Sequence, residues 1–392
     1  MWKYARYAIV LALIAGTSGG FFLGGAWSWL GFVVLFFVGL GLDLVAGDEL
    51  DEREFSRPWL LNTLVFAQLP LLLWCSVAFA WMLSGTDLFL LGRGFEALTG
   101  YPALEARADN GWLATLGGIA SLGLFYASGT VASHELVHRT WSKAAQIAGR
   151  WMLAFTGDAS FAIEHVYGHH IHVGTRRDPA TARRGESVYA FIVRSTVMSY
   201  VSAWRIEKER LAKRGHSTWS LQNRMHRGNA MFACYIAFFA WAAGPLGALC
   251  YVATAVYGKA YLEVVNYIEH YGLVRVPGEP VSPRHSWNCN RRMSTWLTFN
   301  LPRHSHHHAM GQKPYWELRA YPDSPMLPFG YLTMVVIATV PPVFHALMVP
   351  RVLEWDRNYA HDNERPFIDE ANRRSGMTAF QQATPTPSPL PA

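Results

Sequence analysis

Clustered histidines are the side chains of this sequence most able to do chemistry. The chain has 16 histidines in 392 residues, and the stretch RHSHHHAM, residues 303–310, holds four of them. Histidines also recur four residues apart in HELVH and in EHVYGHH, and NYIEHYGLV holds a single one. Positions i and i+4 share a face of an α-helix, so two imidazoles there can reach one metal ion. The candidate ligands are His134, His138, His165, His169, His170, His270, His304, His307 and His308.

The number of candidate ligands predicts two metal ions. Imidazole suits iron, zinc, copper and nickel, and nine ligands are too many for one ion of any of these metals. In an α-helical EHVYGHH, His165 and His169 share a face, whereas His170 points about 100° away and can serve a second ion. In the last cluster, i, i+3, i+4 spacing is held by His304, His307 and His308.

Two simpler interpretations compete with a large metal site. HELVH alone matches the H-E-x-x-H signature of zinc proteases. Histidines also suit membrane interfaces without binding metal, because the ring has an apolar body and a polar tip. Three clusters at the same predicted membrane face favour the metal site, and the ordinary interfacial role is expected for His172, His216, His226, His345 and His361.

Other polar residues lie beside the clusters in the sequence. Metal-bound histidines usually donate their second ring N–H to a carboxylate. His285 and His306 are near enough to support the ligands in the same way, and whether either touches metal stays open. Four carboxylates are expected to accept these N–H groups, although each could instead be a solvated charge or a helix-end partner. They are Glu135, Glu164, Asp178 and Glu269.

Long apolar segments would position these residues. The chain is 51% hydrophobic, and its apolar residues come in blocks. A hydrocarbon core of about 30 Å is crossed by about 20 helical residues. The first block is too long for a cleaved signal peptide, so we expect it to remain. Six segments qualify as membrane spans: 4–25, 27–46, 59–83, 112–132, 229–246 and 247–266.

Basic residues predict the orientation of these spans. Residues 139–227 contain fifteen Lys and Arg, whereas residues 84–111 contain only Arg93 and Arg107. The positive-inside rule therefore places the histidines at the cytoplasmic face. The net charge of +6 then reflects topology and contact with anionic lipid headgroups. No nucleic-acid-binding signature accompanies the charge, so we expect no nucleic-acid partner.

Two regions of the predicted cytoplasmic face, 139–228 and 270–326, are expected to cap the helix bundle, because neither has the apolar content of an independent domain. Within the first region, residues 199–221 interleave apolar and charged positions. This pattern predicts an amphipathic helix, either at the membrane surface or against the cap.

The end of the chain carries a further apolar stretch and a proline-rich tail. Residues 327–350 are interrupted by Pro341 and Pro342, so we expect a packed or re-entrant segment. The tail QQATPTPSPLPA is expected to be disordered. The predicted organisation is a membrane domain over residues 1–365 and a disordered tail over residues 366–392.

Together these residues resemble a known family. The stretches HELVH, EHVYGHHIHVGTRRDPATAR, NYIEHYGLV, RHSWN and RHSHHHAMGQKPYWELRAYPDSPMLPFGY are similar to those of the membrane-bound di-iron alkane 1-monooxygenases, within the fatty-acid desaturase and hydroxylase superfamily. The similarity runs from the first apolar segment to about residue 365. Histidine clusters are shared with desaturases, whereas IEHYGL is characteristic of the hydrocarbon hydroxylases.

The resemblance implies an all-α integral membrane protein, a six-transmembrane-helix bundle whose cytoplasmic cap holds two non-haem iron ions on the nine histidines. It implies a bacterial inner-membrane location with the active site on the cytoplasmic side. The implied reaction is O2-dependent hydroxylation of the terminal methyl group of an apolar hydrocarbon, with medium-chain n-alkanes as the expected substrates and 1-alkanols as products.

The implied electron donor is a rubredoxin or ferredoxin-type protein with its NAD(P)H reductase. The cysteines of this chain form no C-x-x-C pair, so they exclude a fused rubredoxin and require an external carrier. The basic cap would attract an acidic one. The four cysteines lie far apart, at Cys75, Cys234, Cys250 and Cys289.

Alternatives remain for the substrate and the reaction. Three stretches resemble the hydroxylase component of xylene monooxygenase: VPPVFHALMVPRVLEWDRNYA, RRGESVYAFIV and GHSTWSL. Methyl groups on alkyl-aromatic rings of the xylene or cymene type are therefore alternative substrates. Fatty-acyl desaturation would use the same metals. The family often has Asp where this chain has His306. A metal transporter or sensor is disfavoured, because transporters place their ligands near the bilayer midplane.

Overall fold

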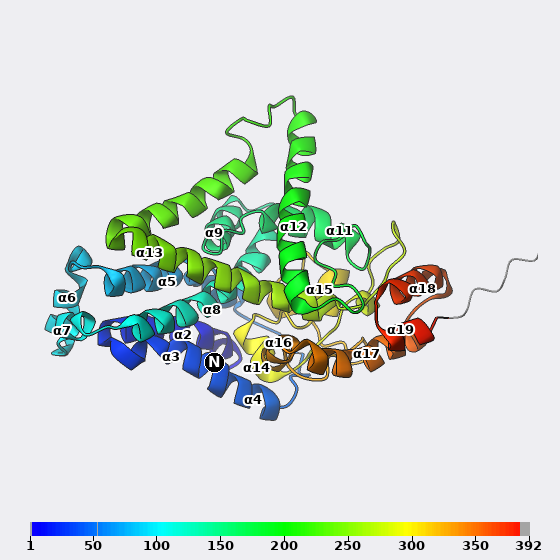
Figure 1. Cartoon of the computed structure of the whole chain (residues 1–392), viewed down its shortest axis with the longest axis horizontal. Helices are drawn as coiled ribbons and strands as arrows, with labels where there is room; N and C mark the ends of the chain where they lie inside the picture. Colours follow the sequence, from blue (N-terminus) through cyan, green and yellow to red (C-terminus); the bar gives the residue numbers. More distant parts are fainter. Residues whose placement is uncertain (1, 53, 385–392) are drawn as a thin grey trace, which may run out of the picture.

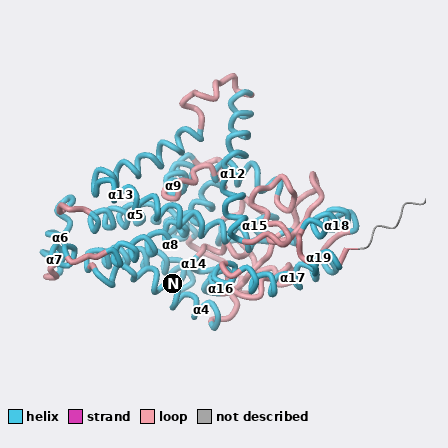
Figure 2. Tube along the Cα trace, in the orientation of Figure 1, coloured by secondary structure: helices cyan, strands magenta, loops and turns pink. Residues whose placement is uncertain are grey.

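The computed structural model describes residues 2–52 and 54–384 and is built from helices (Figures 1 and 2). Within these residues the only β contacts are two isolated bridges. The first half of the chain contains α1 (Trp2–Ala5), α2 (Ile9–Leu23), α3 (Leu30–Val33), α4 (Leu40–Val45), α5 (Pro58–Leu83), α6 (Leu91–Thr99), α7 (Ala103–Ala108), α8 (Trp112–Val137), α9 (Lys143–Ala154), α10 (Phe161–Glu164) and α11 (His170–His172). The second half contains α12 (Val188–Ala212), α13 (Arg224–His270), α14 (Arg292–Leu297), α15 (His304–Ala309), α16 (Tyr331–Ala338), α17 (Pro341–Asn358), α18 (Arg365–Arg374) and α19 (Thr378–Gln382).

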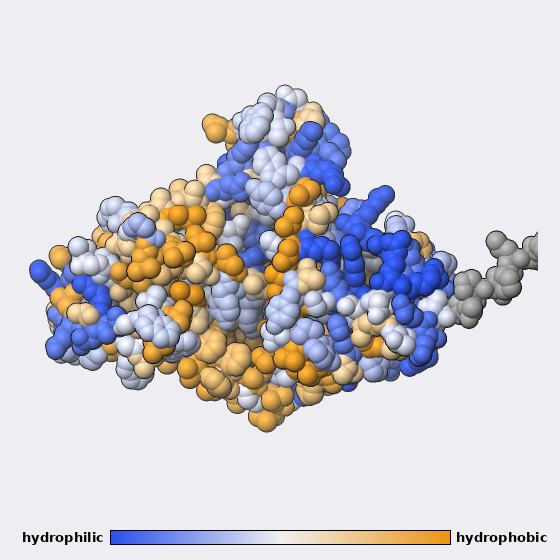
Figure 3. All heavy atoms as spheres, viewed as in Figure 1, coloured by the Kyte–Doolittle hydropathy of each residue, from blue (hydrophilic) through white to orange (hydrophobic). Residues whose placement is uncertain are grey.

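Five helical stretches in the described part of the chain are long and apolar enough to cross a membrane. α2, α5, α8 and the second arm of α13 run side by side, with α6 and α7 at one end of the molecule and α17 to α19 at the other (Figure 1). Hydrophobic residues cover the middle of the face shown in Figure 3, and hydrophilic residues gather at the two ends. The five stretches are Trp2–Leu23, Gly25–Val45, Pro58–Leu83, Trp112–Val137 and Arg224–His270.

The fifth stretch corresponds to two of the six expected spans. The sequence predicts a break between residues 246 and 247, whereas α13 is continuous in hydrogen bonding and kinked at Ala243 and Gly244, just before Pro245. Gly244 has a φ of 64°, a conformation that glycine adopts without a Cβ penalty. The two arms of α13 therefore run in different directions, and the second arm returns along α8 (Figure 1).

α8 is the central helix of the bundle, and glycines allow its close contacts. A Cβ at Gly118 would lie 2.2 Å from Cε2 of Phe79, and one at Gly123 would lie 2.4 Å from Cδ1 of Tyr257. Phe79 is on α5 and Tyr257 is on α13, so these glycines let both helices approach α8. The close approach brings the ends of α8 and α13 together, where each carries histidine.

α12 and the first arm of α13 project from the bundle (Figure 1). The amphipathic helix expected within residues 199–221 is the last part of α12, which begins earlier, at Val188, and ends at Ala212. Its outer face exposes Val193, Val197 and Val201 at successive i+4 positions. This apolar stripe is typical of a helix at a membrane surface.

The region after α15 differs from expectation in one respect. The apolar residues 327–350 form two packed helices, α16 and α17, and Pro341 and Pro342 begin α17, where missing N–H donors cost little. The predicted disordered tail began too early: α18 and α19 lie in it, and Ile368 and Phe380 are buried in the core. Residues 385–392, the rest of that prediction, lie outside the described residues.

Replacing Gly118 with Ala should lower the free energy of unfolding by about 1–3 kcal/mol, because the new methyl group overpacks against the buried Phe79 ring. Gly41→Ala is the matched control. It makes the same chemical change in a helix where the Cβ meets no atom within 4 Å, and should raise stability by about 0.4–1 kcal/mol. Thermal unfolding of the purified variants in detergent measures both, and equal Tm values would contradict the packing argument.

Candidate metal centre

Nine buried or half-buried histidines converge where the bundle meets the cap. They are the nine candidate ligands of the sequence analysis. His134 and His138 come from the end of α8, and His270 is the last residue of α13. The others come from α15 and from the turn that precedes and begins α11. Segments far apart in the chain therefore supply one site.

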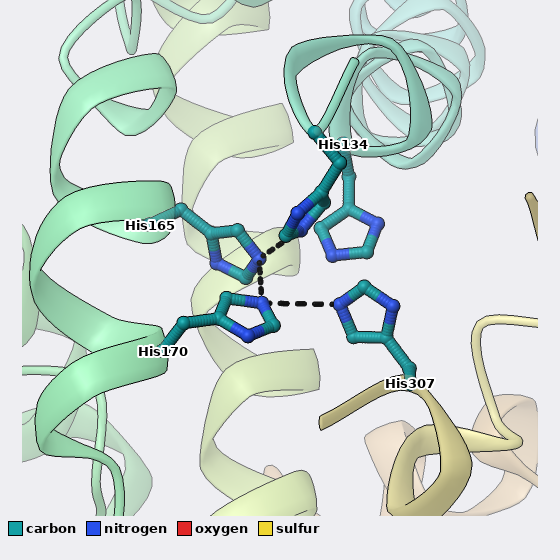
Figure 4. Close-up of side chains that lie close together, drawn as sticks. His134, His165, His170 and His307 are labelled. Carbon is teal, nitrogen blue, oxygen red and sulfur yellow. Dashed lines mark hydrogen bonds between the residues drawn. The ribbon is translucent and has the colours of Figure 1, made fainter. Parts of the chain in front are cut away.

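The first set, called the five-histidine group, draws on three of these segments. Its ligand atoms all lie within 4.8 Å of one another. Nε2 of His165 lies 3.1 Å from Nε2 of His138 and 3.1 Å from Nε2 of His170. Nε2 of His170 lies 3.1 Å from that of His307, so the rings point toward one shared space (Figure 4). The members are His134, His138, His165, His170 and His307.

The second set, the four-histidine group, is fully buried. Nε2 of His304 lies 3.1 Å from Nε2 of His270 and 3.0 Å from Nε2 of His308. Nε2 of His308 lies 3.3 Å from Nε2 of His169. These four rings thus surround a second space, namely those of His169, His270, His304 and His308. The close contacts within each group join Nε2 atoms.

These distances fit metal binding. Two imidazole nitrogens that bind one ion at about 2.1 Å lie about 3.0–3.4 Å apart at octahedral or tetrahedral angles. Burial lowers the pKa of His170 to about 3. The His170 ring is therefore neutral and has a lone pair for a cation. Burial lowers the pKa values of further members well below the usual range, namely His138, His165, His304, His307 and His308.

The backbone of EHVYGHH corrects the expected pairing. Residues His165–His169 form a π-helical turn, with i→i+5 hydrogen bonding instead of the α-helical i→i+4. The wider turn places His165 and His170 in one group and His169 in the other. The prediction that His165 and His169 share a face was wrong, because it assumed 3.6 residues per turn. Adjacent histidines still divide between two sites, as expected.

The second ring nitrogens, Nδ1, do not all contact a carboxylate as expected. Nδ1 of His169 lies 2.9 Å from Oδ2 of Asp178, and Thr181 donates a 2.6 Å hydrogen bond to the same oxygen. The sequence analysis overlooked Thr181, although an Asp followed three residues later by Thr is a common local hydrogen-bonding pattern. Nδ1 of His270 lies 3.4 Å from the carbonyl oxygen of His285.

Three other expected carboxylates have different surroundings. Glu135 accepts hydrogen bonds from Arg139 and from the backbone N–H of Tyr315. Oε1 of Glu164 has no hydrogen-bond partner among the described residues. Oε2 of Glu269 lies 3.5 Å from Nε2 of His304, on the side of the ring that faces the group.

His285 and His306 belong to neither group. Nε2 of the His285 ring lies 2.9 Å from Oε1 of Glu364. His285 therefore supports the site through its backbone carbonyl oxygen, which lies behind the His270 ring. Nδ1 of His306 accepts a 2.7 Å hydrogen bond from the backbone N–H of Arg319. Both rings have partners that direct them away from the groups.

An apolar cavity lies inside the bundle, and none of the nine histidines lines it. Its lining comes mainly from α8, α13 and α16 and includes Val131, Leu262 and Val335. A smaller cavity, which contacts His134 and His307, shares part of this lining. The residues common to both cavities are Val131, Thr298 and Leu301.

Long apolar helices around two buried histidine groups define a multi-pass membrane protein with a metal site. The family model for fatty acid desaturase matches residues 110–338. The chain is 36% identical to alkane 1-monooxygenase 1 of Pseudomonas aeruginosa, with 88% of each chain covered. It is 33% identical to alkane 1-monooxygenase 2 of Alcanivorax borkumensis over 83% of each chain, and 30% identical to the xylene/toluene monooxygenase hydroxylase component of Pseudomonas putida over 95% of each.

The protein belongs to the fatty acid desaturase family and is an oxidoreductase of the monooxygenase type found there. The sequence motifs identified this family, and the comparisons confirm it.

Asp178→Asn should weaken binding of the metal by about 10–100-fold, because the amide no longer accepts the His169 N–H as strongly as a carboxylate. Titration of metal-free protein with ferrous iron, followed by the bound metal per chain, measures the effect. Asp109→Asn changes an exposed carboxylate at the other end of α8 and should leave binding unchanged. Equal affinities for the two variants would exclude the positioning role of Asp178.

Proposed function

We propose that the nine histidines hold two iron ions and that the protein is an O2-dependent hydroxylase of the terminal methyl group of apolar hydrocarbons, with medium-chain n-alkanes as substrates. One observation carries the proposal: two buried groups of imidazoles lie inside a membrane bundle, and two members of the five-histidine group line a small cavity that shares part of its lining with a larger apolar one. The bound iron would supply the activation of O2, from which one oxygen atom enters the methyl C–H bond and the other leaves as water.

The chain's own residues then have three tasks. The apolar cavity binds the hydrocarbon and excludes water, and it can receive the molecule from the bilayer between helices. The shared lining at Val131, Thr298 and Leu301 directs one end of the substrate toward His134 and His307. The supporting contacts of His169 and His270 fix the orientation of their rings.

The proposed topology has six crossings, with the histidines at the cytoplasmic face of a bacterial inner membrane. The kink at Ala243 and Gly244 supports two separate crossings for the arms of α13. The excess of Lys and Arg in residues 139–227 supports the orientation.

An external rubredoxin or ferredoxin-type protein, reduced by its NAD(P)H reductase, is the proposed electron donor. A cleft of about 520 Å³ supports an acidic carrier, because six arginines and two carboxylates, Asp178 and Glu370, line it. Asp178 contacts His169 of the four-histidine group, so a carrier in the cleft would dock close to the metal site. The arginines of the cleft are Arg176, Arg177, Arg183, Arg184, Arg275 and Arg374.

Methyl groups on alkyl-aromatic rings are the second candidate substrates. The match to the xylene/toluene monooxygenase component covers 95% of each chain, against 88% for the alkane 1-monooxygenase, although at lower identity. Fatty-acyl desaturation remains an alternative reaction, which the product distinguishes.

Competition between octane and p-xylene tests the function. Cells that express the chain with a rubredoxin or ferredoxin system receive both compounds under labelled O2, and the products are quantified by mass. Labelled 1-octanol in excess is expected, because the cavity lining is aliphatic at most positions. Labelled methylbenzyl alcohol in excess would establish the aromatic substrate, and an alkene without label would establish a desaturase.

His307→Ala provides the control for that experiment. Because His307 contacts both the five-histidine group and the small cavity, the variant should lose bound iron and at least a hundredfold in product formation, as is typical when a metal ligand's support is lost. His216→Ala changes a histidine outside both groups and should retain both. Full turnover by His307→Ala would contradict the site assignment.

Charge reversal tests the docking cleft. Arg374→Glu should raise KM for an acidic carrier by roughly tenfold at low salt. The substitution places a negative charge at the cleft, which repels the negative carrier and slows association. Turnover with a small chemical reductant should not change. Arg93→Glu, at the α6 end of the molecule, is the matched control. An unchanged KM for the carrier would exclude docking at this cleft.

A further inference from the structure

The position of Glu269 sets it apart from the other carboxylates near the histidines. It is the residue before His270 at the end of α13 and is 2% exposed. Its Oε2 atom lies 3.5 Å from Nε2 of His304, the same atom that faces His270 and His308. Asp178, in contrast, contacts the opposite nitrogen of His169. Glu269 therefore lies on the metal-facing side of a ring, not behind it.

No cationic side chain neutralises Glu269 within the described part of the chain. Its one close ion-pair partner there is the His304 ring, and its Oε1 atom has no hydrogen-bond partner. Two other buried carboxylates have cationic partners, Arg139 for Glu135 and Lys259 for Glu263. Oε1 of Glu164, like that of Glu269, has no hydrogen-bond partner among the described residues. A buried carboxylate without a counter-charge is strongly unfavourable. Glu269 therefore either carries a proton or has a positive group beside it, and a bound metal ion would be that group.

Metal binding changes the nature of the contact with His304. When Nε2 of His304 binds an ion, that nitrogen carries no hydrogen and cannot donate to Glu269. The nearest positive charge is then the ion. Two ligand atoms at about 2.1 Å from one ion lie about 3.0–3.4 Å apart, close to the 3.5 Å between Glu269 and His304. The carboxylate oxygen is therefore at ligand distance from Nε2 of His304. It lies outside the set of ring atoms that are all within 4.8 Å of one another, so the Glu269 side chain must turn inward to bind the ion.

The neighbours of Glu269 connect it with the apolar cavity. The Tyr331 hydroxyl is its neighbouring polar group, and Tyr331 lines the cavity. The four-histidine group also has one ligand fewer than the other group. With a carboxylate at this position, both ions would have the same number of protein ligands. The second ion would also have a negative ligand that the first ion lacks.

We propose that Glu269 is the fifth protein ligand of the ion held by His169, His270, His304 and His308. The inference rests on the proposed function, in which iron occupies both groups. It makes the two ions chemically different: one has only neutral ligands, and the other has a carboxylate. The negative ligand favours the higher oxidation state of the second ion, so the two ions differ in redox potential.

Mössbauer spectroscopy of the full chain, loaded with ferrous ⁵⁷Fe in detergent, tests this proposal. The wild-type protein should give two subspectra of equal area. Glu269→Gln keeps the shape of the side chain but removes its charge, and should change or remove one subspectrum while the other stays as it was. Two unchanged subspectra with full iron content would overturn the assignment.

Matched variants separate a ligand from a structural residue. Glu263→Gln changes a buried carboxylate on the same helix that pairs with Lys259, and should keep both subspectra. Tyr331→Phe removes only the hydroxyl beside Glu269 and should also keep two ions. If Glu269→Gln does not fold, Glu269→Asp retains the charge at a shifted position. It should fold, bind iron and alter the same single subspectrum, and unaltered spectra would again exclude the ligand role.

Failure of the proposed function gives a different result. A wild-type chain that binds no iron would contradict the proposed function and leave nothing for Glu269 to bind. A wild-type chain with two iron subspectra and labelled alcohol as product would support the proposed function. Unchanged spectra of Glu269→Gln in that protein would then contradict the Glu269 proposal alone.

Discussion

The burial of nine imidazoles with their Nε2 atoms facing one another is the constraint on which this structure depends. Ring nitrogens 3.0–3.3 Å apart bring several lone pairs together in a medium of low dielectric constant. A cation bound in each group would attract all of these lone pairs. The membrane bundle supplies the remaining condition, because close packing of α5 and α13 on α8 brings the ends of α8 and α13 to one place.

The chemistry of the site could be predicted largely from the sequence. Residue type and i+4 spacing selected eight of the nine histidines that the structure brings together, and the position of His270 at the end of an apolar segment selected the ninth. The distribution of ligands in EHVYGHH could not be predicted, because hydrophobic and helical patterns do not reveal a π-helical turn. The side from which Glu269 approaches His304 also depends on tertiary packing, so the expectation of a supporting role behind the ring had no means of distinguishing the two sides.

The fold was predictable where apolar blocks were long. All six expected spans lie on helices of the described residues, and the last two join at a kink at Ala243 and Gly244, a few residues before the break that the sequence predicted. The C-terminal boundary failed for a different reason. Composition identified the proline-rich end, yet α18 is polar overall and is held by a few contacts, such as Asn372 with Arg184. Polar helices stabilised by tertiary contacts lack a clear pattern.

Two pairs of consecutive histidines, His169–His170 and His307–His308, divide between the two groups. Consecutive Cα atoms are held about 3.8 Å apart by covalent bonds, so each pair links the two groups at a fixed backbone spacing. The two groups are therefore joined to each other twice by the backbone itself, independently of any packing contact between helices.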